Sequence, residues 1–344
     1  MSLIKYIIRR ILAFIPVLFG AVTLIFLLSR IMPGDPVTAY LIRMNISNPT
    51  TYEEMYDYIS RELWIDRPIH MQYVRYIKDV FSGNWGYSIS IFRGGDVWNL
   101  IIQRLPRTID LALFSILISS FIGIKAGLFS AKHRNKFSDT LVRGLVLLGV
   151  SIPAFYMGIL VQYYFSYKLR WFPATGFKSS NYDNPEFITG FRVIDCLISG
   201  EFYLIIDYLY HLILPVFCLT FITLAGITRH SRSSMLEILE QDYIRTARAK
   251  GCEEKDVYRI HVLKNSLISI ITIIGLNLAS LFSGAILIEI TFGLNGIGKL
   301  LIEAIYSSDY WVLNAVVFVI TMMFLITTLI MDLIYSFVDP RIRI

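Results

Sequence analysis

The chain has 344 residues, of which 55% are hydrophobic and 17% charged, with a mean hydropathy of +0.59 and a formal net charge of +6. A soluble globular domain is less apolar than this, so the composition indicates a protein embedded in a membrane. No folded basic domain is visible to carry the positive charge, which therefore predicts contact with anionic lipid rather than with nucleic acid.

Six apolar runs are each long enough to cross roughly 30 Å of hydrocarbon, which takes about 20 helical residues. They are Ile11 to Ile31, Thr108 to Ser130, Gly144 to Tyr167, Tyr208 to Gly226, Ser266 to Ile290 and Val312 to Phe337. The first run follows "KYIIRR" and no small-residue cleavage site follows it, so we expect a retained helix and not a signal peptide. The sequence thus predicts an all-α polytopic membrane protein with six transmembrane helices.

The positions of Lys and Arg predict the orientation, because these residues gather in the short cytoplasmic loops of membrane proteins. With the N-terminus inside, the cytoplasmic segments hold Lys5, Arg9, Arg10, Lys132, Arg134, Lys136, Arg143, Arg229, Arg232, Arg245, Arg248, Lys250, Lys255, Arg259, Lys264, Arg341 and Arg343. We therefore expect a multi-pass protein of the plasma or inner membrane with both termini in the cytoplasm.

Residues 32–107, between the first two runs, are polar enough to lie in water on the extracytoplasmic side. Within them "YEEMYDYISRELW" and "IHMQYVRYIKDVF" have helical spacing of apolar residues, whereas glycines break the pattern of "SGNWGYSISIFRGGD". The chain is thus divided into an N-terminus with the first helix over 1–31, an insertion over 32–107 and a five-helix core over 108–344.

Small residues and prolines within the runs predict how the helices pack. Gly123 and Gly127 form a small-xxx-small pair, which lets two helix backbones approach closely. Pro153 and Pro215 lie inside runs and are expected to kink them.

The fifth run carries polar residues at a spacing of three, Asn277, Ser280 and Ser283, which places them on roughly one face of a helix. Such a face either lines a translocation path or makes hydrogen bonds between helices, and the spacing leaves both alternatives open.

The segment "GLNGIGKL", Gly293 to Leu300, matches the phosphate-binding pattern G-x-x-x-x-G-K-[ST] except at its last position. Leu300 has no hydroxyl to bind magnesium, and the predicted topology puts the segment outside, away from ATP. We therefore expect a glycine-rich turn between two helices and no nucleotide binding by this chain.

No residues indicate an enzyme or a metal site. The five histidines lack ligand spacing, the three cysteines are far apart, and no nucleophile has a neighbouring base. We expect neither catalytic residues nor a bound metal.

A charged block at about residues 230–265 separates the fourth and fifth runs. Its first half has an apolar stripe at helical spacing, formed by Leu236, Leu239, Tyr243 and Ala247. Gly251 is expected to end this helix, and a second periodic stretch then leads into the fifth run. The block is either two helices with a turn, held by another protein, or a solvated loop.

Motifs along nearly the whole chain carry a family resemblance. They are "YIIRRILAFIPVLFGAVTLIFLLSRIMPGDP", "DRPIHMQYVRYIKDVFSGNWGYSI", "RLPRTIDLAL", "SIPAFYMGIL", "RTARAKG", "RIHVLKNSL", "FGLNGIGKLLIEAI" and "DLIYSFVDPRIRI". In this order they resemble the inner-membrane permease subunits of ATP-binding-cassette (ABC) importers, specifically the dipeptide, oligopeptide and nickel permease family. The chain departs from the family pattern at Ser269, where proline is common, and at "LNG", where Trp-Pro-Gly is common.

The resemblance implies a type I ABC importer permease fold and a set of partners. These are a second, homologous permease, two cytoplasmic ATPase subunits that bind ATP and Mg²⁺, and an extracytoplasmic solute-binding protein. "RTARAKG" is similar to the family's E-A-A-x-x-x-G loop, which implies that the segment couples the permease to an ATPase. The implied coupling residues are Tyr243, Arg245, Thr246, Ala247, Lys250 and Gly251.

The resemblance implies peptides as the first choice of substrate, with oligosaccharides or nickel chelates as alternatives carried by the same permease type. A reading of a different class is an ATP-independent secondary transporter or channel. It predicts inverted repeats and broken or charged helices at mid-membrane, which the sequence does not clearly show.

Overall fold

The computed structural model describes residues 3–31, 35, 37–38, 41, 49–62, 64–92 and 94–338. The described elements are α1 (Leu3–Ile31), α3 (Pro49–Glu62), α4 (Ile69–Ser82), α5 (Val97–Lys132), α6 (Phe137–Ser151), α7 (Ala154–Val161), η1 (Gln162–Lys168), α8 (Arg192–Ser199), α9 (Phe202–Leu239), α10 (Asp242–Ala249), α11 (Glu254–Asp256), η2 (Val257–Leu263), α12 (Lys264–Gly284), α13 (Ile286–Thr291), α14 (Ile297–Tyr306) and α15 (Tyr310–Val338). The all-α prediction is confirmed, while Arg341 and Arg343 lie outside the described residues.

Among the described residues, five stretches of helix are long and apolar enough to cross a membrane. They are Ile7–Ile31, Val97–Lys132, Phe202–Leu239, Glu254–Ser283 and Tyr310–Ile334. Phe137–Ser151 and Ala154–Lys168 are long and apolar enough only when taken together, and they are bent by 99° relative to each other. With this pair counted as one span, the prediction of six transmembrane segments is confirmed.

The bend between α6 and α7 falls where the sequence predicts a kink. Ile152 has an extended backbone, with φ −93° and ψ 122°, and Pro153 precedes the first residue of α7. A residue before proline avoids the helical region because the proline ring clashes with its backbone, so the helix stops and restarts. Pro215 behaves differently, since α9 runs through it without interruption.

The predicted fifth run, Ser266 to Ile290, is wrong as a single helix. It divides into α12, which ends at Gly284, and α13, which begins at Ile286. The apolar residues continue across this break, and hydropathy alone therefore does not detect it.

The crossing of α5 and α9 lies at the centre of the fold. A Cβ atom on Gly127 would lie 2.6 Å from the Cβ of Ser231 and 3.1 Å from the carbonyl oxygen of Thr228. One on Gly123 would lie 2.8 Å from a methyl group of Ile227. The predicted close approach of two helices at this glycine pair is confirmed, and buried side chains of α5, α7, α9, α12 and α13 form an apolar cluster beside it.

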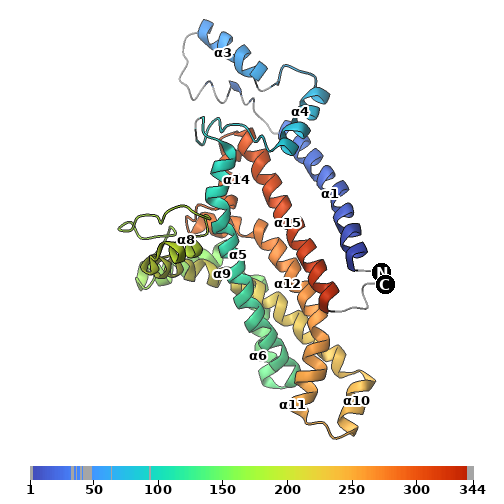
Figure 1. Cartoon of the computed structure of the whole chain (residues 1–344). Helices are drawn as coiled ribbons and strands as arrows, with labels where there is room; N and C mark the ends of the chain where they lie inside the picture. Colours follow the sequence, from blue (N-terminus) through green and yellow to red (C-terminus); the bar gives the residue numbers. More distant parts are fainter. Residues whose placement is uncertain are drawn as a thin grey trace.

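The insertion after α1 forms α3 and α4, at the helical segments that the sequence predicts (Figure 1). It is tied to the membrane helices by buried or half-buried polar contacts. The hydroxyl groups of Thr23 on α1 and Tyr73 on α4 lie 2.6 Å apart. Asp309, just before α15, accepts hydrogen bonds from the hydroxyl of Ser88 at 2.7 Å and the amide of Ser90 at 2.9 Å.

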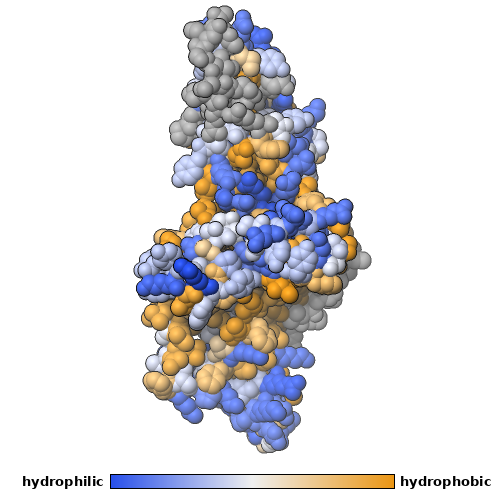
Figure 2. Space-filling model, turned by 90° about the vertical axis from the view of Figure 1, so that its left-hand side faces the viewer, coloured by the Kyte–Doolittle hydropathy of each residue, from blue (hydrophilic) through white to orange (hydrophobic). Residues whose placement is uncertain are grey.

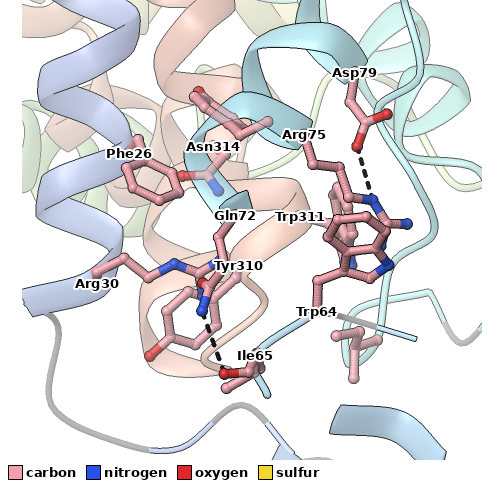
Figure 3. Close-up of a pocket in the computed structure, with 12 residues that line it drawn as sticks. Phe26, Arg30, Trp64, Ile65, Gln72, Arg75, Asp79, Tyr310, Trp311 and Asn314 are labelled. Atoms are coloured by element: carbon pink, nitrogen blue, oxygen red, sulfur yellow. Dashed lines mark hydrogen bonds and ion pairs between the residues drawn. The ribbon is translucent and has the colours of Figure 1, made fainter. Parts of the chain in front are cut away.

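A small cavity of about 50 Å³ lies among α1, α4 and α15 at this end of the molecule (Figure 3). The side-chain amide of Gln72 donates to the carbonyl oxygen of Ile65, and the guanidinium of Arg75 lies 4.7 Å from the ring centre of Trp64. Arg75 also pairs with Asp79 on the same helix. These contacts hold the segment that links α3 and α4 against the membrane helices.

The second membrane helix begins earlier than the predicted boundary at residue 107. α5 starts at Val97, where the carboxylate of Asp96 accepts a hydrogen bond of 2.8 Å from the amide of Asn99 and so caps the helix. The first turns of α5 therefore belong to the part of the chain that was assigned to the insertion.

The surface changes in polarity along the long axis of the molecule. Figure 2 shows a largely apolar zone between a hydrophilic lower tip and a more hydrophilic region higher on the same face. Many large apolar side chains of α1, α5, α6 and α9 are exposed, as expected for helices that contact lipid or other membrane subunits.

We predict that Gly127→Ala lowers the thermal stability of the purified chain in detergent, because the added methyl group overlaps Ser231 and the α9 backbone. Overpacking of this kind costs about 1–3 kcal/mol. The matched control is Gly144→Ala on α6, where a Cβ meets no atom within 4 Å. Equal melting temperatures for the two variants would contradict the proposed packing.

Candidate functional site

The charged block forms a short helix, α10, at the opposite end of the molecule from α3 and α4 (Figure 1). α9 runs from the membrane region to Leu239, and the chain then turns at Glu240 and Gln241 into α10. After α10 a second turn leads to α11, which continues through η2 into α12. α10 is therefore the link between two long membrane helices.

One face of α10 is packed onto the rest of the chain. Ile244 is fully buried and Ala247 is 8% exposed. Ile244 belongs to an apolar cluster with Ala131 of α5, Met235 of α9 and Val257 of η2. Because this cluster joins α5, α9, α10 and η2, α10 cannot shift without moving or unpacking the ends of these helices.

The other face of α10 is polar and open to solvent. The side chain of Arg245 is 73% exposed and pairs with Asp242 at 3.3 Å, and Tyr243 is 43% exposed. Thr246 and Lys250 are also exposed. Aromatic and arginine side chains on an exposed surface are typical of a contact with another protein.

Gly251 ends the helix as the sequence predicts. Its φ is +82°, a left-handed conformation that costs glycine little because it has no Cβ atom. The amide of Gly251 donates to the carbonyl of Arg248 at 2.9 Å, and that of Cys252 donates to the carbonyl of Ala247 at 3.2 Å. The guanidinium of Arg248 then binds the carboxylate of Glu254 at 2.7 Å, which fixes the far side of the turn.

The apolar stripe predicted for this block is wrong at Tyr243, whereas Ala247 is buried as predicted. It assumes one helix, but α9 ends at Leu239 and the break shifts the phase of α10 relative to α9. As a result Tyr243 faces outward and Ile244 faces the interior beside Ala247. The spacing of three between Ile244 and Ala247 is the signal in the sequence that identifies the buried face.

A buried ion pair supports the end of α9, and the sequence analysis did not identify it. Asp139, at the start of α6, is fully buried and accepts two hydrogen bonds of 2.8 Å from the guanidinium of Arg232. It also accepts a hydrogen bond from the hydroxyl of Ser130 at 2.5 Å. Nearby, Arg134 pairs with Glu240 at 2.8 Å, so the α5–α6 loop holds the segment from which α10 begins.

The near-match to a phosphate-binding loop, "GLNGIGKL", forms the turn before α14. The carboxylate of Glu289 accepts hydrogen bonds from the hydroxyl of Thr108 at 2.6 Å and the amide of Lys299 at 3.0 Å. The hydroxyl of Thr108 in turn accepts one from the amide of Ile297. A Cβ on Gly296 would lie 2.4 Å from the Glu289 carboxylate. Amides that would bind a phosphate are thus bonded to protein, and the interpretation as a turn is confirmed.

The three polar residues of the fifth run lie on α12. Asn277, Ser280 and Ser283 each donate a hydrogen bond to a carbonyl oxygen one turn earlier in their own helix. Within the described part of the chain these side chains make no hydrogen bond to another helix, and both serines are exposed. Their role in lining a path stays a prediction.

Metal-ligating side chains are scattered in the structure. The described residues contain no group of three or more His, Cys, Asp or Glu side chains placed to hold a metal ion. Cys196 and Cys218 are buried, Cys252 is exposed, and all three are free thiols.

Comparison with known proteins gives matches over nearly the whole chain. Residues 123–344 match the model of the binding-protein-dependent transport system inner membrane component, and residues 3–112 match the model of the N-terminal part of such membrane components. The chain is 36% identical over 342 residues to the di/tripeptide transport system permease protein DppB of Pseudomonas aeruginosa, with 99% of each chain covered. It is 35% identical over 338 residues to the oligopeptide transport system permease protein AppB of Bacillus subtilis, with 98% of this chain and 99% of the relative covered.

We predict that Asp139→Asn destabilises the chain, because it removes the charge that neutralises Arg232 in a largely buried site. Breaking a buried ion pair costs about 3–5 kcal/mol, and the 20% exposure of the Arg232 side chain puts the expected loss at or below the lower end of that range. Asp242→Asn is the matched control, since the Asp242 side chain is 95% exposed. Thermal unfolding in detergent measures both variants, and equal stability would show that the Asp139 charge is dispensable.

Proposed function

The chain belongs to the family of inner membrane components of binding-protein-dependent transport systems, and we propose that it is the permease subunit of an ATP-driven importer of di- and oligopeptides. The observation that carries this proposal is the two-faced α10. Its buried face is fixed to the ends of the membrane helices, and its polar face is presented to a partner.

The proposed partner of α10 is one of two cytoplasmic ATPase subunits. ATP and Mg²⁺ would be bound by those subunits. In support, the amides of Ile297 and Lys299 in "GLNGIGKL" are bonded within the protein and are not available to a phosphate. The contact residues are Tyr243, Arg245, Thr246 and Lys250 on the exposed face. Ala247 and Gly251 act differently, since Ala247 packs inward and Gly251 shapes the turn.

The path by which movement reaches the membrane follows from the connectivity of α10. α9 is one uninterrupted helix of 38 residues, and Glu254–Ser283 forms a second rod of 30 residues. A force on α10 is transmitted along both rods because Ile244 packs against residues of each at the junction. ATP binding shifts the access state only if the ATPases hold α10 more tightly in one state than in the other.

A second permease subunit and an extracytoplasmic solute-binding protein complete the proposed importer. The exposed side of α12 that carries Ser280 and Ser283 would face the second permease across the translocation path. In this arrangement both chain termini and α10 lie in the cytoplasm, whereas α3 and α4 face the binding protein outside.

The proposed cargo follows from the relatives, which are named as transporters of di- and tripeptides or oligopeptides. No feature of the described residues favours oligosaccharides or nickel chelates over peptides. Uptake of labelled di- and oligopeptides by the reconstituted importer tests the assignment, and uptake of only a sugar or a nickel chelate would overturn it.

We predict that the double variant Tyr243→Ala and Arg245→Ala lowers peptide uptake by reconstituted vesicles at least about tenfold. A loss of about 1.4 kcal/mol in the contact with the ATPase is sufficient for this effect. Thermal stability of the purified chain should stay unchanged, because both side chains point away from its core.

The control for this experiment is Lys255→Ala, beyond the turn and also exposed, which should transport normally. Ile244→Asp should instead destabilise the chain itself, because it buries a charge among apolar side chains. Uptake at the unmodified level by the double variant would show that α10 is not the coupling element.

The orientation is tested with the cysteines of the chain itself, of which only Cys252 is exposed. A membrane-impermeant thiol reagent added to intact cells should leave Cys252 unmodified and should label it after the cells are opened. Asn84→Cys, in the exposed turn after α4, should be labelled from outside. The reverse pattern would invert the proposed topology.

A further inference from the structure

α6 packs beside α9 and the end of α5 (Figure 1). A groove of about 340 Å³ runs along α6 at this contact. It is formed by Ser130, Val142, Arg143, Val146, Leu147, Val150, Thr228, Arg229, Arg232 and Ser233. Gly149 of α6 lies close against α9, since a Cβ atom on Gly149 would lie 3.0 Å from the Cβ of Ala225. Neither α10 nor the face of α12 that carries Ser280 and Ser283 contributes to this groove.

One end of the groove is strongly basic. Arg143, Arg229 and Arg232 line it, and the acidic group that faces them is Asp139. Asp139 is already bound by two nitrogens of Arg232, and its oxygen lies 3.9 Å from Arg143. Arg229 is exposed and has no hydrogen bond or ion pair within the described part of the chain. Three guanidinium groups and one carboxylate leave an excess of two positive charges at this end of the groove, and Arg229 is the one furthest from neutralisation.

The other end of the groove is apolar. Val142, Val146 and Val150 recur every four residues along α6, and Leu147 is 67% exposed beside them. From Arg143 to Val150 the helix rises about 10 Å, so the lining changes from charged to aliphatic within the length of a few methylene groups. Thr228 lies between the two ends, and its buried hydroxyl has no partner among the described residues.

We propose that this groove binds an anionic phospholipid, with the phosphate at Arg143 and Arg229 and an acyl chain along the aliphatic side of α6. Excess positive charge directly beside an exposed aliphatic strip matches the two parts of such a lipid. A zwitterionic lipid does not supply the missing negative charge, and a free phosphate ion leaves the aliphatic part uncovered.

The test is native mass spectrometry of the complete chain in detergent, titrated with phosphatidylglycerol or with phosphatidylcholine of the same acyl chains. We expect preferential binding of phosphatidylglycerol, reduced at least roughly tenfold in the double variant Arg143→Gln and Arg229→Gln, because each basic group near a membrane surface contributes several-fold to anionic lipid binding. Arg232 is left intact because Asp139 depends on it.

The matched control is Arg9→Gln, which changes an exposed arginine of α1 outside the groove and should leave lipid binding unaltered. A second variant, Leu147→Trp, fills the aliphatic part at an exposed position and should reduce binding without removing charge. Loss of binding in both groove variants, with the melting temperature unchanged, supports the site.

Three outcomes would overturn the proposal. One is equal binding of the two lipids, and another is undiminished phosphatidylglycerol binding by the double variant. The third is displacement of the lipid by millimolar inorganic phosphate, with Leu147→Trp having no effect, which would identify an anion site that does not use an acyl chain.

Discussion

The contact of α5 with α9 at Gly127 is the constraint on which the position of α10 depends. Glycine lets the two backbones meet. Ser130, one turn further along α5, donates to the carboxylate of Asp139 at the start of α6. That carboxylate in turn binds Arg232 of α9. A side chain on Gly127 would push α9 away from α5 and lengthen the bonds between Arg232 and Asp139. α5, α6 and α9 are thus joined at one level, and α10 starts two turns beyond it.

This junction stiffens the end of the molecule that carries α10, whereas the apolar helices contain breaks. The α6–α7 pair bends by 99° at Pro153, and α12 gives way to α13 after Gly284. By contrast α9 continues through Pro215 and carries the junction at its end. A transporter that alternates between two access states needs rigid helices that move as units and positions between them where the chain can bend. In this chain α9 is a continuous helix, and the breaks lie elsewhere in the sequence.

Local sequence patterns predict the membrane helices, the glycine pair of α5 and the turn at Gly251, because each depends on residues close together in the chain. The division of α9 from α10 is different. Leu236, Leu239, Tyr243 and Ala247 fit one helix, and only the tertiary burial of Ile244 against Val257 and Met235 selects the break. The pairing of Asp139 with Arg232 likewise joins residues 93 positions apart. The spacing of residues along the sequence does not predict contacts between such distant positions. It likewise does not predict the hydrogen bond from the amide of Lys299 to the carboxylate of Glu289.

Two sets of charged side chains near the α10 end of the membrane helices differ, and the difference indicates where the membrane surface lies. Arg232 with Asp139, and Arg10 with Asp332, are ion pairs that can lie partly out of water. Arg143 and Arg229 retain positive charge on the surface, which is costly in hydrocarbon and therefore belongs at the level of the lipid headgroups. α10 follows α9 beyond Arg229 by several helical turns. If the headgroups lie at Arg143 and Arg229, α10 must project into water, which is where a soluble ATPase could reach it.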